Sequence, residues 1–78
     1  MAKIYGAQIG IVLNALDPMG KGRAQVRLPS LGTADSSWAP VCRPFGAVAG
    51  GGPQIGANVV VLFENGDPDS PIILGRID

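Results

Sequence analysis

Three acidic side chains near the C-terminal end of the chain are the residues whose types and spacing could perform chemistry. In the stretch FENGDPDSPIILGR they are Glu64, Asp67 and Asp69. Closely spaced carboxylates can bind a cation, or act together as a general acid and a general base. A calcium loop of the EF-hand type needs ligands at its positions 1, 3, 5 and 12 with glycine at position 6, and this spacing does not match. Because Pro68 and Pro71 also stiffen the segment, we expect no metal site here.

The same stretch is explained better as the turn of a β-hairpin. An acid–base pair would need a cleft that shifts the pKa of its carboxyl groups, and a surface turn supplies none. The Asn65-Gly66 step suits positive φ angles, and the Asp-Pro and Ser-Pro steps that follow start turns and disfavour helix. We therefore predict a hairpin turn whose acids keep the tip soluble.

The rest of the chain offers no alternative catalytic set. It contains no histidine and one cysteine, so zinc lacks a plausible ligand set and an internal disulfide is impossible. No serine or cysteine lies beside a base, and the stretch MGKG lacks the spacing of a phosphate-binding loop. We expect a protein that is not an enzyme, with no catalytic residue, no cofactor and no metal.

The length and charge of the chain limit the classes of protein further. Its 78 residues allow one domain, residues 1–78, and a core this small leaves a thin margin of stability that oligomerisation would increase. Six basic residues are scattered among six acidic ones, which argues against nucleic acid as a partner. No apolar run is long enough to span a membrane and no signal peptide is recognisable, so we expect a protein made in the cytoplasm.

The elements that must position the acidic turn are predicted to be strands. Twelve glycines and seven prolines argue against long helices. Apolar and β-branched runs predict five strands, and a small sheet avoids bare edges by closing on itself. The expected fold is all-β, a small five-stranded OB-type Greek-key barrel. Its strands are expected at residues 4–14, 23–29, 36–45, 58–65 and 71–78.

The loop of residues 46–56 has five glycines and no charge, which is unusual for a loop in water. It could fold back over the mouth of the barrel, or it could contact another subunit or a partner. The candidate contact residues are Ala47, Val48, Pro53 and Ile55.

Two stretches of the chain resemble a known family. GIVLNALDPMGKGRAQVRLPSLG is similar to a family opening of the form G.V.N..DP...GRV.V..P.LG. IGANVVVLFENGDPDSPIILGRI resembles the more specific closing pattern G.EV.V.FE.GDPD.P...G. The family is the OB-fold domain of phage baseplate assembly protein V, phage tail-spike proteins and the VgrG spikes of type VI secretion. The residues that match its motif are Trp38, Phe63, Glu64, Gly66, Asp67, Pro68, Pro71, Gly75 and Arg76.

The resemblance implies a structural role in a contractile injection machine. In such spikes the OB barrel resembles a trimeric collar between a hub and a membrane-piercing needle, and it is not known for catalysis. This sequence lacks the hub domains and the needle, so we expect only the role of the collar module to apply to it. We expect a homo-oligomer, most simply a trimer or a multiple of trimers, that acts as a hub or spike adaptor. Its partners would be hub or needle proteins, in the producing cell's cytoplasm or in a virion or tail-like particle.

Two other functions remain open. The same barrel could be a self-assembling building block of a larger closed shell or ring. From a different class, an OB barrel could bind single-stranded nucleic acid, although that use needs aromatics over a basic groove.

Overall fold

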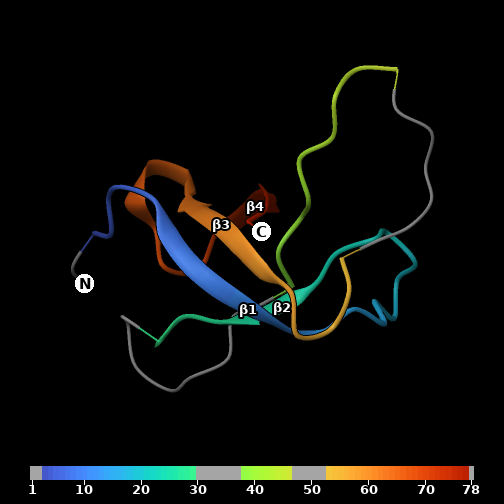
Figure 1. Cartoon of the computed structure of the whole chain (residues 1–78). Helices are drawn as coiled ribbons and strands as arrows, with labels where there is room; N and C mark the ends of the chain where they lie inside the picture. The colour runs from blue at the N-terminus through green and yellow to red at the C-terminus, as the bar shows by residue number, and fades with distance from the viewer. Residues whose placement is uncertain (1–2, 30–37, 47–52, 78) are drawn as a thin grey trace.

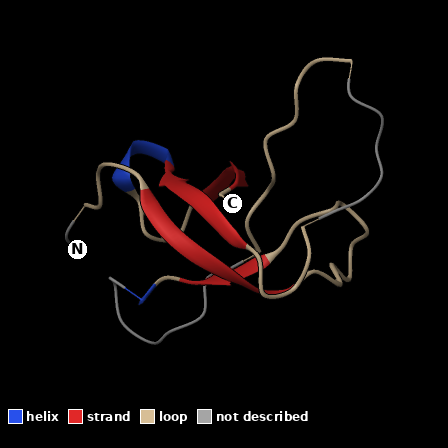
Figure 2. Ribbon diagram, in the orientation of Figure 1, coloured by secondary structure: helices blue, strands red, loops and turns tan. Residues whose placement is uncertain are grey.

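The computed structural model describes residues 3–29, 38–46 and 53–77, and its described part is built on one antiparallel sheet (Figure 1). The strands are β1 (Gln8–Asn14), β2 (Gln25–Arg27), β3 (Asn58–Phe63) and β4 (Pro71–Arg76). Their order in the sheet is β2-β1-β3-β4. Figure 2 shows the short 3-10 turn η2 (Glu64–Gly66), which joins β3 to β4. The all-β class is confirmed, and the sheet itself is open and four-stranded.

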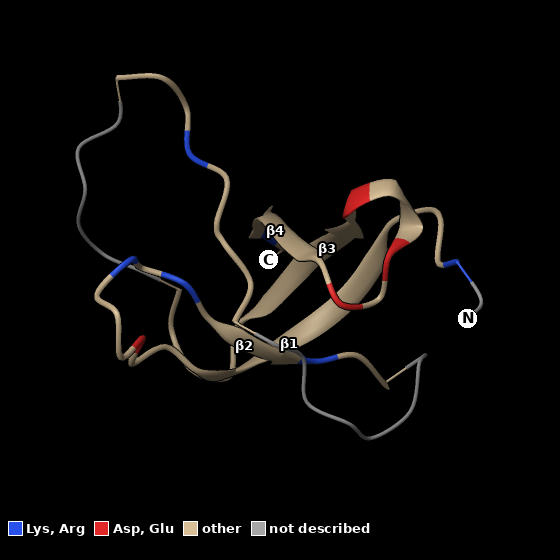
Figure 3. Cartoon of the chain, turned by 180° about the vertical axis from the view of Figure 1, so that it is seen from behind, with Lys and Arg blue, Asp and Glu red and all other residues tan. Residues whose placement is uncertain are grey.

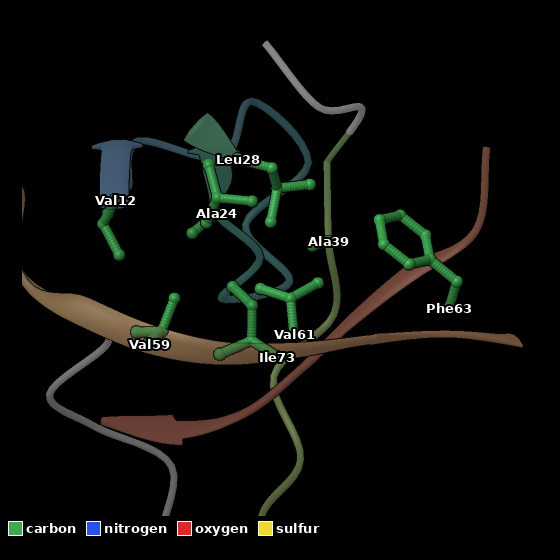
Figure 4. Close-up of a cluster of buried hydrophobic side chains, with 9 residues drawn as sticks. Val12, Ala24, Leu28, Ala39, Val59, Val61, Phe63 and Ile73 are labelled. Atoms are coloured by element: carbon green, nitrogen blue, oxygen red, sulfur yellow. The ribbon is translucent and has the colours of Figure 1, made fainter. Parts of the chain in front are cut away.

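The core lies on one face of this sheet because alternate residues of each strand point the same way. Val59, Val61 and Phe63 of β3 are buried, while the residues between them are half-buried on the opposite face. Figure 4 shows these side chains facing Leu28 and Ala39. Among the described residues the buried cluster consists of Val12, Ala24, Val26, Leu28, Ala39, Val59, Val61, Phe63 and Ile73.

Two register shifts bend the sheet around this core. Between β1 and β2 the pairing jumps from Val12 to Asn14, and between β3 and β4 one residue of β4, Leu74, has no opposite residue. Such bulges increase the local bend and twist of a strand. Gly10 lies inside β1 at a close approach of neighbouring side chains. A Cβ at Gly10 would lie 3.3 Å from side-chain atoms of both Leu28 and Val61.

The first strand begins later than predicted. The sequence predicts a strand from residue 4, but β1 starts at Gln8. Gly6 has a φ of 85°, which turns the chain out of the extended conformation. The backbone of Ile4 hydrogen bonds to the turn η2 instead, with its N–H 2.8 Å from the carbonyl oxygen of Gly66. The first described residues therefore form an arm rather than part of the strand.

The predicted strand at residues 36–45 is represented by two isolated bridges. Ala39 pairs antiparallel with Ala24, through N–H to carbonyl distances of 2.7 and 3.0 Å. Val41 pairs parallel with Ile73 of β4. The N–H of Ile73 donates to the carbonyl of Pro40 at 2.9 Å, and the N–H of Cys42 donates to the carbonyl of Ile73 at 2.8 Å. Residues 39–42 thus hydrogen bond to the chain next to β2 on one side and to β4 on the other.

Beyond this bridging segment the chain leaves the sheet. Residues 43–46, at the yellow-green end of the described segment in Figure 1, continue away from the strands, and residues 53–57 lead back to the start of β3. We call residues 43–46 the finger, because they lie beyond the last bridge. The finger ends in a turn at Phe45 and Gly46.

Candidate functional site

The acidic stretch is the turn between β3 and β4, as the sequence predicts. Asn65 and Gly66 have φ angles of 52° and 75°. The N–H of Glu64 donates to the carbonyl of Ser70 at 3.0 Å, and the N–H of Asp67 donates to the carbonyl of Glu64 at 2.9 Å. Asn and Gly tolerate the left-handed conformation better than other residues do, so this pair allows the chain to reverse here.

The carboxylates of this turn point to solvent or bond within it. Asp67 Oδ1 accepts the backbone N–H of Asp69 at 2.9 Å, a local bond that shapes the loop. Glu64 is exposed, and Pro71 is buried as the first residue of β4. Among the residues that the structure describes, no group of three or more His, Cys, Asp and Glu could hold a metal ion. The arrangement observed is that of a structural turn.

The turn is held from the other end of the chain, which the sequence did not reveal. Besides the bond from Ile4, Lys3 Nζ lies 3.3 Å from the carbonyl oxygen of Asn65. Gly66 is buried, and a Cβ placed on it would lie 2.8 Å from Cε1 of Tyr5. The ring of Tyr5 therefore covers the one residue of the turn that has no side chain. We call residues 3–6 the N-terminal arm.

A hollow of about 300 Å³ lies beside the acidic turn. Its apolar lining includes Trp38, Pro40 and Ile72, and its charged lining is Glu64 and Asp69. Trp38 and Pro40 come from the segment that bridges to Ala24 and Ile73, and the other lining residues come from the β3–β4 hairpin. The hollow therefore joins two parts of the chain that are distant in sequence. Several motif residues meet here, which the linear motif alone could not show.

The remaining motif residues have separate positions. Phe63 is buried in the core, and Pro68 is half-buried in the turn. Gly75 follows the bulge of β4, where a Cβ would meet open space. Arg76 is exposed and pairs with Val59 across the strands.

A second organised loop lies between β1 and β2, centred on Asp17. Its carboxylate accepts the backbone N–H groups of Met19, Lys21 and Arg23 at 2.9 to 3.3 Å. It also accepts Nε and Nη2 of Arg23 at 2.8 and 2.9 Å. The Asp17 side chain is only 2% exposed, and the guanidinium lies 6.0 Å from the centre of the Trp38 ring.

These bonds perturb the ionisation of both partners. The Arg23 guanidinium, helped by the three backbone N–H groups and opposed by burial, holds the pKa of the Asp17 carboxyl well below its usual range. The carboxylate in turn raises the pKa of Arg23. The sequence analysis did not select these residues; the signal for them was the DP…GR spacing, which places Arg23 within reach of Asp17.

The predicted contact residues lie in the chain between the finger and β3. Ala47 and Val48 fall outside the described residues. Pro53 is half-buried and Ile55 is 67% exposed. The structure adds Phe45, whose side chain is fully exposed at 108% of its reference area and which the sequence analysis did not select.

Fold and site together define a small all-β domain whose most distinctive feature is a structural hairpin turn. The chain belongs to the family of type VI secretion system/phage-baseplate injector OB domains, whose model matches residues 8–77. This match confirms the resemblance found in the two sequence patterns. A comparison with curated proteins finds no match.

Family membership fixes the coarse function. Such a domain is a structural part of a phage baseplate or of a type VI secretion injector, that is, of a virion or tail-like particle assembled from many chains. Within the described residues, no helix is long and apolar enough to cross a membrane.

Proposed function

We propose that the chain is a non-catalytic assembly protein: an OB barrel of the spike-collar type that forms a homotrimer. It serves as a hub or spike adaptor in a phage tail or a related contractile injection system. Residues 1–78 form a single such domain, and the partners beyond its own copies are hub or needle proteins of the same machine. The family match over residues 8–77 supports this class of function.

In this proposal the sheet closes into the five-stranded Greek-key barrel of the OB fold. Residues 39–42 are the fifth strand, since their backbone groups bond to Ala24 on one side and to Ile73 on the other. Closure removes the free edges that β2 and β4 would otherwise present to solvent and to other chains. A closed barrel is also a rigid unit, which suits a component that must hold its shape within a particle.

The observation that carries the proposal of self-assembly is the outer face of the sheet. The outward positions of antiparallel strands are commonly polar, because they meet water. Here Ile9 of β1 is 50% exposed and Leu74 of β4 is 46% exposed, with further apolar side chains between them. We call this surface the outer face; it consists of Ile9, Ile11, Leu13, Val60, Leu62, Ile72 and Leu74.

An apolar outer face is costly in water and favours burial against another protein surface. The described residues form a core of nine buried hydrophobic side chains, and burial between subunits adds stability that so small a core supplies only narrowly. The exposed Ile55 and half-buried Pro53 extend the apolar contact surface beyond the sheet.

The proposal is tested by placing a charge on the outer face. Ile9→Asp is expected to lower the oligomeric state to monomer in sedimentation velocity, while the far-ultraviolet circular dichroism stays that of a folded β protein. Leu16→Asp is the matched control, because Leu16 is 82% exposed and lies in the loop after β1. A wild-type chain that is monomeric, or an Ile9→Asp variant that sediments as the wild type does, would contradict the proposal.

The sedimentation of the wild-type chain, together with an oligonucleotide-binding assay, separates the other candidate functions. A very large uniform particle would indicate a building block of a closed shell or ring. Salt-dependent binding of a single-stranded oligonucleotide would indicate a nucleic-acid-binding barrel, and we expect none.

A further inference from the structure

The finger and the hollow are both incomplete within one copy of the chain. Phe45 is fully exposed at 108% of its reference area, so it makes no packing contact with its own copy. The hollow beside the acidic turn has an apolar lining of Trp38, Pro40 and Ile72, which no side chain of the described residues fills. An aromatic ring exposed to water and an open apolar hollow are both unfavourable. The ring could fill the hollow, and the hollow could remove the ring from water.

The two features carry opposite charges. Arg43 is exposed on the finger, two residues from Phe45. Glu64 and Asp69 line the hollow. In Figure 3 red segments mark the turn between β3 and β4, and the blue segment of the finger lies away from that turn. A further red segment lies on the loop between β1 and β2, where Asp17 is paired with Arg23. A basic aromatic finger and an acidic apolar hollow are therefore complementary in charge as well as in polarity.

Within one copy the finger is held away from this hollow. The Arg43 guanidinium lies against the loop between β1 and β2, where a Cβ on Gly22 would be 2.9 Å from Nη2. Hence the complement of the finger is on another molecule. A finger that binds a different surface on the next copy makes a heterologous contact, and heterologous contacts close into rings when the rotation allows it.

We propose that the finger of one copy docks into the hollow of a second copy of the same chain, with Phe45 against Trp38 and Arg43 against Glu64. This inference rests on the proposed homo-oligomer and names the contact that closes its ring. Each subunit gives one finger and receives one, so every interface contains the same pair.

A charge-swap cycle tests the contact. Arg43→Glu and Glu64→Arg are each expected to raise the concentration at which half of the chain is assembled by at least about tenfold, since close interfacial charge pairs couple strongly. The double variant restores one opposite-charge pair at every interface and should return to within about threefold of the wild type. Lys21→Glu, an equal charge change at an exposed residue of the loop between β1 and β2, is the control and should have little effect.

Phe45→Ser tests the apolar half of the contact. It should raise the same half-assembly concentration by about 30-fold, as expected for the loss of an aromatic anchor. It should leave the thermal unfolding of the dilute monomer unchanged, because Phe45 is exposed. Trp38 is the only tryptophan of the chain, so its emission reports the hollow directly. That emission should change on assembly of the wild type and stay constant in Phe45→Ser over the same concentrations.

The outcomes distinguish this inference from the proposed function. A wild-type oligomer that tolerates both Arg43→Glu and Phe45→Ser would refute the finger contact and leave the homo-oligomer intact. Weakening by Phe45→Ser without rescue in the charge-swap double variant would place the finger on a surface other than the hollow. A chain that stays monomeric, and docks its finger only on a different protein, would refute both.

Discussion

Replacing Gly66 by alanine is expected to destabilise the fold more than the same replacement at other glycines. Gly66 has a φ of 75°, in the left-handed region, where a Cβ costs about 1–2 kcal/mol. The new Cβ would also lie 2.8 Å from Cε1 of Tyr5 and 3.1 Å from Cβ of Lys3, so the N-terminal arm must move. Overpacking of this kind costs typically about 1–3 kcal/mol. We therefore expect Gly66→Ala to lower the free energy of unfolding by about 2–5 kcal/mol.

Two other glycines separate the contributions. Gly20 has a φ of 65° but open space around its Cβ position, so Gly20→Ala should show only the backbone cost of about 1–2 kcal/mol. Gly75 has open space and lies in β4 without a positive φ, so Gly75→Ala should be neutral or stabilising by up to about 1 kcal/mol. The order of stability should be Gly75→Ala, then Gly20→Ala, then Gly66→Ala.

Urea denaturation at one fixed protein concentration measures these differences, since assembly makes apparent stability depend on concentration. In a Tyr5→Ala background the cost of Gly66→Ala should fall toward that of Gly20→Ala, because the ring that it displaces is gone. Equal costs for Gly66→Ala and Gly20→Ala in the wild-type background would refute the contact between the arm and the turn.

Two further predictions concern the Asp17 loop and the core. Asp17→Asn should lower the free energy of unfolding at neutral pH and make it depend less on pH in acid. Because the pKa of Asp17 is depressed in the folded chain, this carboxylate stabilises the fold above the ordinary carboxyl pKa of about 4. That stabilisation is lost progressively as the pH falls below about 4. Melting temperatures of both proteins between pH 2 and 6 check this, and parallel curves would contradict it. Ile73→Ala, at a side chain 1% exposed, should cost about 2–5 kcal/mol in urea denaturation, whereas Leu74→Ala, 46% exposed, should cost less than about 1 kcal/mol in the monomer. Equal costs would show that the inward and outward positions of β4 are misassigned.

The features that sequence could predict are those set by neighbouring residues. The hairpin turn follows from Asn65-Gly66, whose positive φ angles need no distant contact. The strand at residues 58–65 follows from its run of β-branched and apolar residues, and β3 occupies most of it.

The features that sequence could not predict depend on residues far apart in the chain. The N-terminal arm looks like the start of a strand, and only the folded chain brings Tyr5 onto Gly66. The hollow needs Trp38 beside the hairpin, a pairing that no local pattern encodes. The exposed Phe45 resembles any other aromatic in the sequence until its surroundings are known.

The predicted strand at residues 36–45 could be predicted only in part. Its prolines at positions 40 and 44 disfavour a continuous strand, and in its described residues the structure has only isolated bridges. They could not indicate that Ala39 bonds toward β2 while Pro40 and Cys42 bond to Ile73. Which strand a short segment joins is decided by tertiary packing, and packing is not readable from a single sequence.

The central claim, that this OB domain assembles with its own copies, is tested most directly by the native mass of the purified wild-type chain. Native mass spectrometry across a hundredfold range of concentration should show a species of three copies of the 8.0 kDa chain that dissociates only on dilution. A single-copy mass at every concentration would contradict the account.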